Sequence, residues 1–138
     1  MKYLIRGLKH PQRSAVLDAC GVWTYEELLR RAENVAARLL GRWELKREDR
    51  VGLFLNRRKE SVALLLGVWS AGAVAVPFSA RGTAREIAYQ IVDAGISHII
   101  AGPEFQKVLD AGLALRREQG VIPRVIEAAS LLEGKSSP

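Results

Sequence analysis

The sequence predicts an α/β fold: a three-layer sandwich with a mainly parallel sheet, preceded by a β-hairpin and a long helix. Two observations support this prediction. Short apolar runs, typical of strands buried on both faces, alternate along the chain with helical segments. Such alternation requires right-handed parallel crossovers, which place helices on both faces of the sheet. The length of 138 residues fits one domain, with 49% hydrophobic and 26% charged residues.

The first structured element is expected to be the hairpin. Two β-prone runs, 15–17 and 22–24, flank residues 18–21. The composition of this short segment favours a turn, and its glycine can adopt the positive φ that a tight hairpin requires.

The first long helix is expected to begin after Thr24, which has the spacing of a capping box with Glu27. In that motif each side chain bonds the free backbone N–H of the other residue. Apolar residues then recur at helical spacing from Leu28 to Leu40, and Gly41 is expected to cap the C-terminus of the helix.

The remaining elements supply the predicted sheet and its crossover helices. We expect two buried strands at 51–55 and 73–78, and further strands at 97–101 and 124–126. The crossover helices are expected at 59–71, 83–95 and 104–119. Gly112 is expected to interrupt the third of these helices, and residues 134–138 to form a flexible tail.

Composition excludes several classes of function. A single cysteine, Cys20, excludes an internal disulfide framework, and the presence of only two histidines excludes a zinc cluster of cysteines and histidines. The longest apolar stretch, 62–78, is broken by glycine, serine and proline, so no membrane span is expected.

The net charge is +6, but the basic runs lack interleaved aromatic residues, so we expect a solvated basic face and no nucleic-acid partner. No secretory signal is visible, and the expected location is cytoplasmic.

Five segments, in this order and at these distances, resemble the N-terminal portion of the adenylate-forming (AMP-binding) superfamily. They lie at 15–28, 48–51, 56–60, 66–77 and 86–93. The superfamily comprises acyl-CoA synthetases, firefly luciferases and the adenylation domains of peptide synthetases. Within it, the chain most resembles the acyl-CoA synthetases.

The resemblance implies that residues 1–133 form the N-terminal α/β subdomain of an AMP-dependent ligase. Such a ligase uses ATP and Mg²⁺ to join a carboxylate to AMP, and coenzyme A (CoA) then displaces the AMP. The superfamily's Ser/Thr/Gly-rich phosphate loop, ribose-binding Asp and catalytic Lys have no counterpart in these 138 residues. We therefore expect a fragment or split piece of an acyl-CoA synthetase, with no catalytic residue and no cofactor of its own. The alternative is a free-standing binding or regulatory module that shares only the fold.

A few polar residues are candidates for a site. Asn56 and Glu60 follow the first buried strand, and we favour helix capping for them over contact with a ligand. Arg81 and Arg85 stand near the start of the helix at 83–95, where phosphate can bind a helix N-terminus. The resemblance implies that this loop approaches the coenzyme side, so both arginines are candidates for phosphate contact, although a surface arginine is usually only solvated. No metal site is expected.

His98 lies in an apolar strand and is expected to be a hydrogen-bonded structural residue. Trp43 is expected to be the most exposed of the three tryptophans.

The helix at 59–71 is apolar nearly all round, so its outer face is expected to be covered by another protein surface. That cover is expected to be a second copy, in a homodimer, or a partner that carries the missing C-terminal portion of the synthetase.

Overall fold

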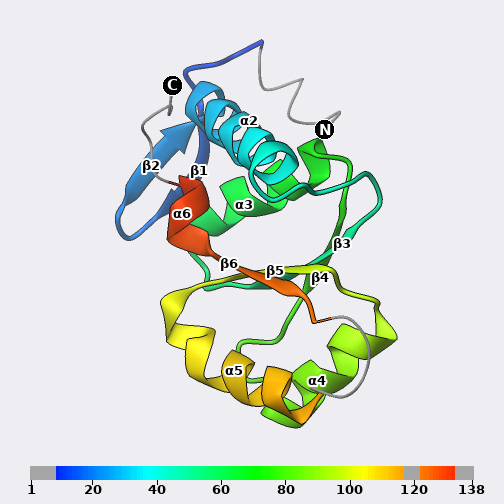
Figure 1. Ribbon diagram of the computed structural model, residues 1–138. Coiled ribbons are helices and arrows are strands. Elements are labelled where there is room, and N and C mark those ends of the chain that lie inside the picture. The colour runs from blue at the N-terminus through cyan, green and yellow to red at the C-terminus, as the bar shows by residue number, and fades with distance from the viewer. Residues whose placement is uncertain (1–8, 117–121, 133–138) are drawn as a thin grey trace.

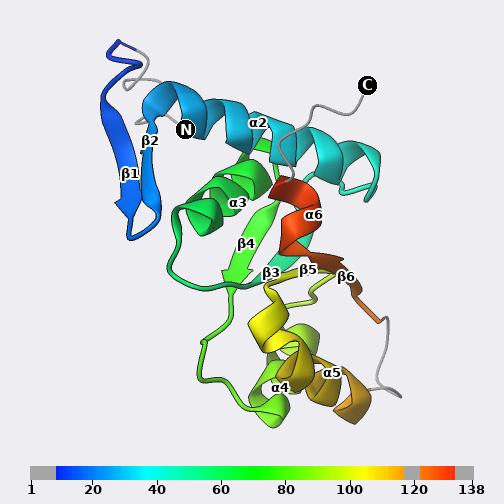
Figure 2. The same ribbon diagram turned by 90° about the vertical axis from the view of Figure 1, so that its left-hand side faces the viewer.

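The computed structural model describes residues 9–116 and 122–132. It confirms the predicted three-layer α/β sandwich and its hairpin (Figures 1 and 2). The hairpin pairs β1 (Ser14–Asp18) with β2 (Gly21–Thr24) in antiparallel fashion. A parallel sheet has the order β4-β3-β5-β6. Its strands are β3 (Arg50–Phe54), β4 (Val74–Pro77), β5 (His98–Ala101) and β6 (Arg124–Glu127).

The helices form one layer on each face of the parallel sheet, as Figures 1 and 2 show. One layer holds α2 (Tyr25–Gly41), α3 (Lys59–Ser70) and α6 (Ala128–Leu132). The other holds α4 (Ala84–Asp93), the short 3₁₀ helix η1 (Pro103–Phe105) and α5 (Gln106–Leu115). α6 was not expected from the sequence. The predicted tail, and the part of the predicted helix 104–119 that follows Arg116, lie outside the described residues.

Each helical layer encloses its own apolar core against the sheet. The core on the α2–α3–α6 side includes Val35, Leu39, Leu64, Val68, Ile100 and Ile126. The core on the other side includes Phe54, Ile87, Ile91, Ile99 and Leu109. The strands β3 and β5 contribute to both cores, as expected for central strands whose apolar runs are continuous.

Two threonines cap helices, and the complete capping box is not the one the sequence analysis proposed. Thr24 is the N-cap of α2 and accepts a hydrogen bond from the N–H of Glu27 at 3.2 Å. The reciprocal bond of a full capping box is present at α4, where the carboxylate of Glu86 accepts from the N–H of Thr83. Thr83 Oγ1 in turn accepts from the N–H of Glu86, so two free N–H groups are satisfied together.

Two predictions about glycines are wrong. Gly41 lies inside the last turn of α2, and the positive φ that follows the helix falls on Glu44, at 52°. Gly112 does not interrupt α5. A Cβ at Gly112 would stand 3.0 Å from the carbonyl oxygen of Ala84, so this glycine allows α5 to approach α4 closely.

The prediction that residues 73–78 form a buried strand is also wrong. β4 lies at one edge of the sheet and Val74 is 46% exposed. The continuous apolar run therefore indicated a strand but not its place in the sheet. No helix among residues 9–116 and 122–132 is long and apolar enough to cross a membrane.

Candidate functional site

The carboxyl ends of the parallel strands meet at one edge of the sheet, where ligands of open α/β folds bind. Beneath this edge lies a buried group of three aromatic rings. The ring of Phe54, at the end of β3, stacks on Phe105 at 4.3 Å between centroids and meets Phe78 edge-on at 5.7 Å. Gly52 is required for this packing, since a Cβ there would lie 2.7 Å from the Phe78 ring. The rings give the edge a rigid apolar floor.

Polar side chains lie next to this floor on the segments that leave the strands. The Asn56 amide donates to Glu104 Oε1 at 3.4 Å and accepts from Ser61 Oγ at 3.4 Å. Asn56 thus connects the segment after β3 with η1 and with α3. Ser79, after β4, accepts from the N–H of Arg81 at 3.3 Å. An amide, a carboxylate and a hydroxyl at one sheet edge can donate to and accept from a polar ligand.

An open hollow of about 350 Å³ adjoins Asn56. Its walls are partly apolar, from β1 and α3, and its rim is basic. The lining includes Val16, Leu17, Asn56, Arg57, Arg58 and Val62. We call the carboxyl edge and this hollow together the edge site. The arrangement suits a ligand that has both an apolar and an anionic part.

The N-terminus of α3 is capped from a distance, by Asp18 at the end of β1. Asp18 Oδ2 accepts from the backbone N–H of Lys59 at 3.0 Å, while Oδ1 lies 3.4 Å from Lys59 Nζ and accepts from the N–H of Cys20 at 2.8 Å. The prediction that Asn56 caps this helix is wrong, because Arg58 occupies the N-cap position and Asp18 supplies the oxygen. Glu60 does lie in the first turn, as expected, with its carboxylate 3.4 Å from Lys59 Nζ.

The ionisation of this pair follows from its contacts. The hydrogen bond from the Lys59 N–H holds the pKa of Asp18 below its ordinary value of 3.8, against the opposing effect of desolvation. Desolvation acts to lower the pKa of Lys59, but the bond to Asp18 and the charge of Glu60 outweigh it and raise that pKa above 10.5. Lys59 Nζ also lies 5.3 Å from the centroid of the Trp23 ring. The pair therefore stays charged at neutral pH and fastens the hairpin to α3.

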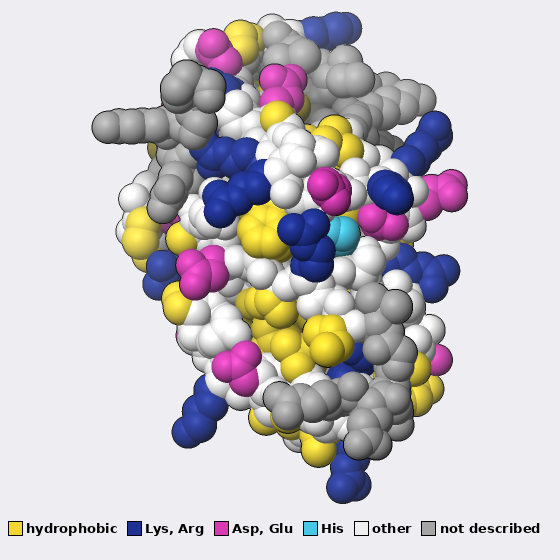
Figure 3. Space-filling view, in the orientation of Figure 1, with side chains coloured by type: hydrophobic (Ala, Val, Ile, Leu, Met, Phe, Trp, Pro, Cys, Tyr) yellow, Lys and Arg dark blue, Asp and Glu magenta, His cyan; other side chains and the backbone are white. Residues whose placement is uncertain are grey.

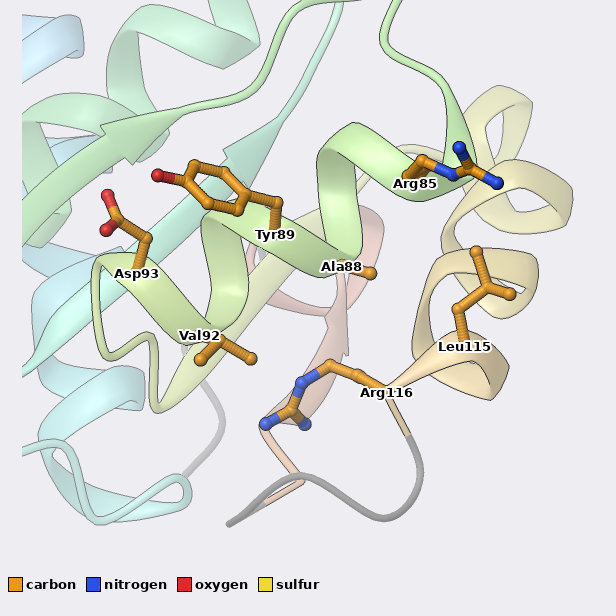
Figure 4. A pocket seen from close by; sticks show the side chains of 7 residues that line it. All are labelled: Arg85, Ala88, Tyr89, Val92, Asp93, Leu115 and Arg116. Carbon is orange, nitrogen blue, oxygen red and sulfur yellow. The ribbon is translucent and has the colours of Figure 1, made fainter.

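Two arginines were proposed for phosphate contact. Arg81 lies in the loop that follows β4, and Arg85 lies in the first turn of α4. Both side chains are exposed. The start of α4 already carries the capping box, so Glu86 places a negative charge where an anion would bind. Arg85 lines a second hollow, of about 440 Å³ between α4 and α5, together with Leu115 (Figure 4). The contacts between described residues do not join Arg81 and Arg85 into one site.

His98 is structural, as predicted. It is buried, with Nδ1 2.8 Å from Ser97 Oγ and Nε2 3.0 Å from the carbonyl oxygen of Trp43. The prediction that Trp43 is the most exposed tryptophan is wrong, because Trp69 is 50% exposed while Trp43 is half-buried beside the core.

In the described part of the chain, no group of three or more His, Cys, Asp or Glu residues could hold a metal ion.

Sequence reasoning missed Asp18, Ser79 and Glu104. Glu104 and Ser79 follow the ends of strands, so the rule that ligands bind at the carboxyl edge would have singled them out. Asp18 carries a weaker signal. An aspartate in a hairpin turn usually bonds its own backbone, and Asp18 does so through Cys20. Its second bond, to a helix 41 residues later, depends on tertiary structure.

A family model described as "AMP-binding enzyme" matches residues 6–137. A long-chain-fatty-acid–CoA ligase from Haemophilus influenzae is 31% identical over 102 residues, which are 74% of this chain and 18% of that protein. A linear gramicidin synthase polypeptide from Brevibacillus parabrevis is 32% identical over 126 residues, which are 88% of this chain and 2% of that protein. The chain thus spans less than a fifth of either relative.

Solved structures share the fold. ATP-bound MatB from Rhodopseudomonas palustris superposes with a TM-score of 0.81 at 27% identity, over 97% of this chain and 27% of that one. A benzoate CoA ligase from Burkholderia xenovorans gives a TM-score of 0.82 over 96% of this chain and 28% of that one. Its identity of 21% supports the fold alone.

Proposed function

This chain belongs to the AMP-binding enzyme family, and we propose that it is the N-terminal portion of an adenylate-forming ligase of the acyl-CoA synthetase type. The observation that carries the proposal is the 31% identity, over 102 residues, with a long-chain-fatty-acid–CoA ligase. The proposed reaction is activation of a carboxylate by ATP, followed by transfer of the acyl group to the thiol of coenzyme A.

The same proposal holds that these 138 residues do not catalyse adenylation by themselves. They contain no Ser/Thr/Gly-rich loop ending in Pro-Lys, which is the feature that holds the triphosphate in this superfamily. A further polypeptide segment, in the same chain or in a partner, would supply that loop, the ribose-binding Asp and the catalytic Lys. ATP and Mg²⁺ would then bind mainly to that segment.

The role proposed for this portion is to form one wall of the substrate side. Asn56 and Glu104 stand at the carboxyl edge above the three phenylalanine rings, and they would position a polar group of the substrate or coenzyme. Arg81 is exposed in the loop after β4 and is proposed to contact coenzyme phosphate. Arg85 lines the hollow between α4 and α5, and no coenzyme contact is proposed for it.

A chimera tests the proposal. In R. palustris MatB, the segment that this chain matches is replaced by this chain, and acid-dependent ATP–pyrophosphate exchange is measured with the acid that MatB itself uses. We expect exchange from the chimera, and none from the isolated chain or from MatB lacking the segment. Exchange by the isolated chain would contradict the proposed incompetence. A folded but inactive chimera would favour the alternative, a binding or regulatory module that shares only the fold.

A second candidate is the adenylation portion of a peptide synthetase, favoured by the 32% identity over 126 residues with the gramicidin synthase polypeptide. The two candidates differ in the thiol that receives the acyl group. The chimera does not distinguish them, because MatB supplies its other residues. Cloning the surrounding gene does so: the complete protein is expected to acylate free coenzyme A, whereas a peptide-synthetase portion acylates the pantetheine of a carrier protein.

A further inference from the structure

The outer face of the α4–α5 layer carries a group of exposed apolar side chains, whereas α3 exposes one large apolar side chain, Trp69. α3 is largely enclosed by its neighbours, with Ala63, Leu64, Leu66 and Val68 buried. In contrast, large apolar side chains on and next to α4 and α5 are 48% to 67% exposed: Tyr89, Val92, Leu115 and Ile122. Figure 3, which views the layers edge-on, shows hydrophobic side chains on the flank of the molecule between the sheet and the α4–α5 layer. Contiguous exposed apolar surface on a soluble domain commonly marks an interface.

The charges on this face complement each other. Arg85 and Asp93 lie at opposite ends of α4 with Tyr89 midway between them, as Figure 4 shows. The spacing of four residues keeps the three side chains within about 80° around the helix axis, and the two charges about 12 Å apart along it. Within the described residues, neither Arg85 nor Asp93 has an ion-pair partner.

This pattern is complementary to itself. If a second α4 lies antiparallel across the first, each arginine faces an aspartate of the other copy and the two Tyr89 rings meet near the two-fold axis. A two-fold interface requires such self-complementarity, because the same patch serves both subunits. The hollow beside Tyr89, lined also by Val92 and Leu115, gives a partner's side chain room to insert.

We propose that this chain binds a second copy of itself through α4, in an antiparallel pairing of Arg85 with the partner's Asp93 around Tyr89. The inference goes beyond the ligase proposal and does not depend on it. Aromatic side chains at the centre of an interface with charges at its rim are the usual anatomy of such contacts. The charged pairs set the orientation, and the apolar side chains supply most of the free energy of association.

Charge reversal tests the pairing, with sedimentation equilibrium over a dilution series as the measurement. Arg85→Asp or Asp93→Arg alone places like charges opposite each other twice, and we expect the dimer dissociation constant to rise about tenfold or more. An equal mixture of the two variants restores both attractive pairs, so we expect a heterodimer about as tight as the wild-type dimer. Neither reversal opposes the helix dipole, because it puts aspartate in the first turn of α4 and arginine in the last. Circular dichroism checks that both variants fold.

The matched control is Leu17→Ser on the hairpin, where the side chain is 73% exposed and far from α4 in the chain. This change is expected to leave dimerisation unaltered. The proposal is overturned by a wild-type chain that stays monomeric at every concentration, which would point to a different polypeptide as the cover of this face. It is equally overturned if mixing the variants gives no heterodimer, or if Leu17→Ser abolishes association while Arg85→Asp does not.

Discussion

Gly67 of α3 lies directly against Val35 of α2, so that a Cβ placed on Gly67 would stand 2.6 Å from the Cβ of Val35. The same Cβ would lie 3.1 Å from the carbonyl oxygen of Ala32. The approach of the two helices is therefore set by the absence of one side chain.

Substitution of Gly67 by alanine is expected to destabilise the fold. Alanine favours an isolated helix by about 1 kcal/mol, but overpacking against Val35 costs about 1–3 kcal/mol, so we expect a net loss of up to about 2 kcal/mol. The free energy of unfolding by urea measures the change. Gly41→Ala is the matched control, because this glycine is also helical and a Cβ there meets nothing within 4 Å. The control is expected to be neutral or stabilising, and an equal loss at both positions would show that crowding is not the cause.

The two threonine caps give a second prediction. Thr24→Ala and Thr83→Ala each remove an oxygen that accepts a hydrogen bond from the third residue of a helix, at a cost of about 1 kcal/mol. We expect similar losses at the two positions, because the reciprocal bond at α4 is donated by the backbone N–H of residue 83, which alanine keeps. Urea midpoints at unchanged slope are the measurement. An unchanged midpoint in either variant would show that the hydroxyl at that position does not stabilise its helix.

These contacts show which parts of the fold the sequence could predict. Helices, strands and the cap at Thr24 follow from residues within one turn of each other, so local patterns were enough. Gly112 was misread as a break because its reason, the close approach of α4, depends on a helix far away in the sequence. The cap that Asp18 provides for α3 was missed for the same cause. Position in the sheet is likewise non-local, which is why β4 was expected to be buried and is an edge strand.

The candidate site was predicted less well than the fold. Asn56 was expected to cap the following helix, and its side chain instead bonds Glu104, which joins segments that follow two different strands. Only the strand order brings those segments together. Arg81 and Arg85 come from one loop and the first turn of a helix, and their nearness in sequence does not place them in one site.

A third prediction concerns acid. The pKa of Asp18 is lowered in the folded chain by the N–H of Lys59, so the ionised carboxylate stabilises the fold above the unfolded value of about 3.8. This contribution is lost as the pH falls through the lower pKa of the folded state. Asp18→Asn should therefore be less stable than wild type at neutral pH, and the difference in urea midpoint should shrink below about pH 4. A difference that stays constant down to strongly acidic pH would show that the charge of Asp18 does not matter.

The last prediction tests the edge site in the MatB chimera. Asn56→Ala removes the amide that joins the end of β3 to Glu104 and Ser61, and it leaves the three phenylalanine rings in place. Because Asn56 is at the carboxyl edge, where the substrate side is proposed to be, we expect KM for the acid or for coenzyme A to rise about tenfold. Removal of one hydrogen bond between the protein and a bound ligand weakens binding by up to about this factor.

Gln106→Ala is the matched control for Asn56→Ala. Gln106 also uses a side-chain amide in a bond to a carboxylate, that of Asp110 at 2.7 Å, but this bond lies within α5 and not at the strand ends. We expect the control to leave KM unchanged. Equal stability of the two variants, measured by urea, separates a role in binding from a role in folding. If Asn56→Ala lowers stability and leaves KM unaltered, Asn56 only ties β3 to η1, and the substrate binds elsewhere.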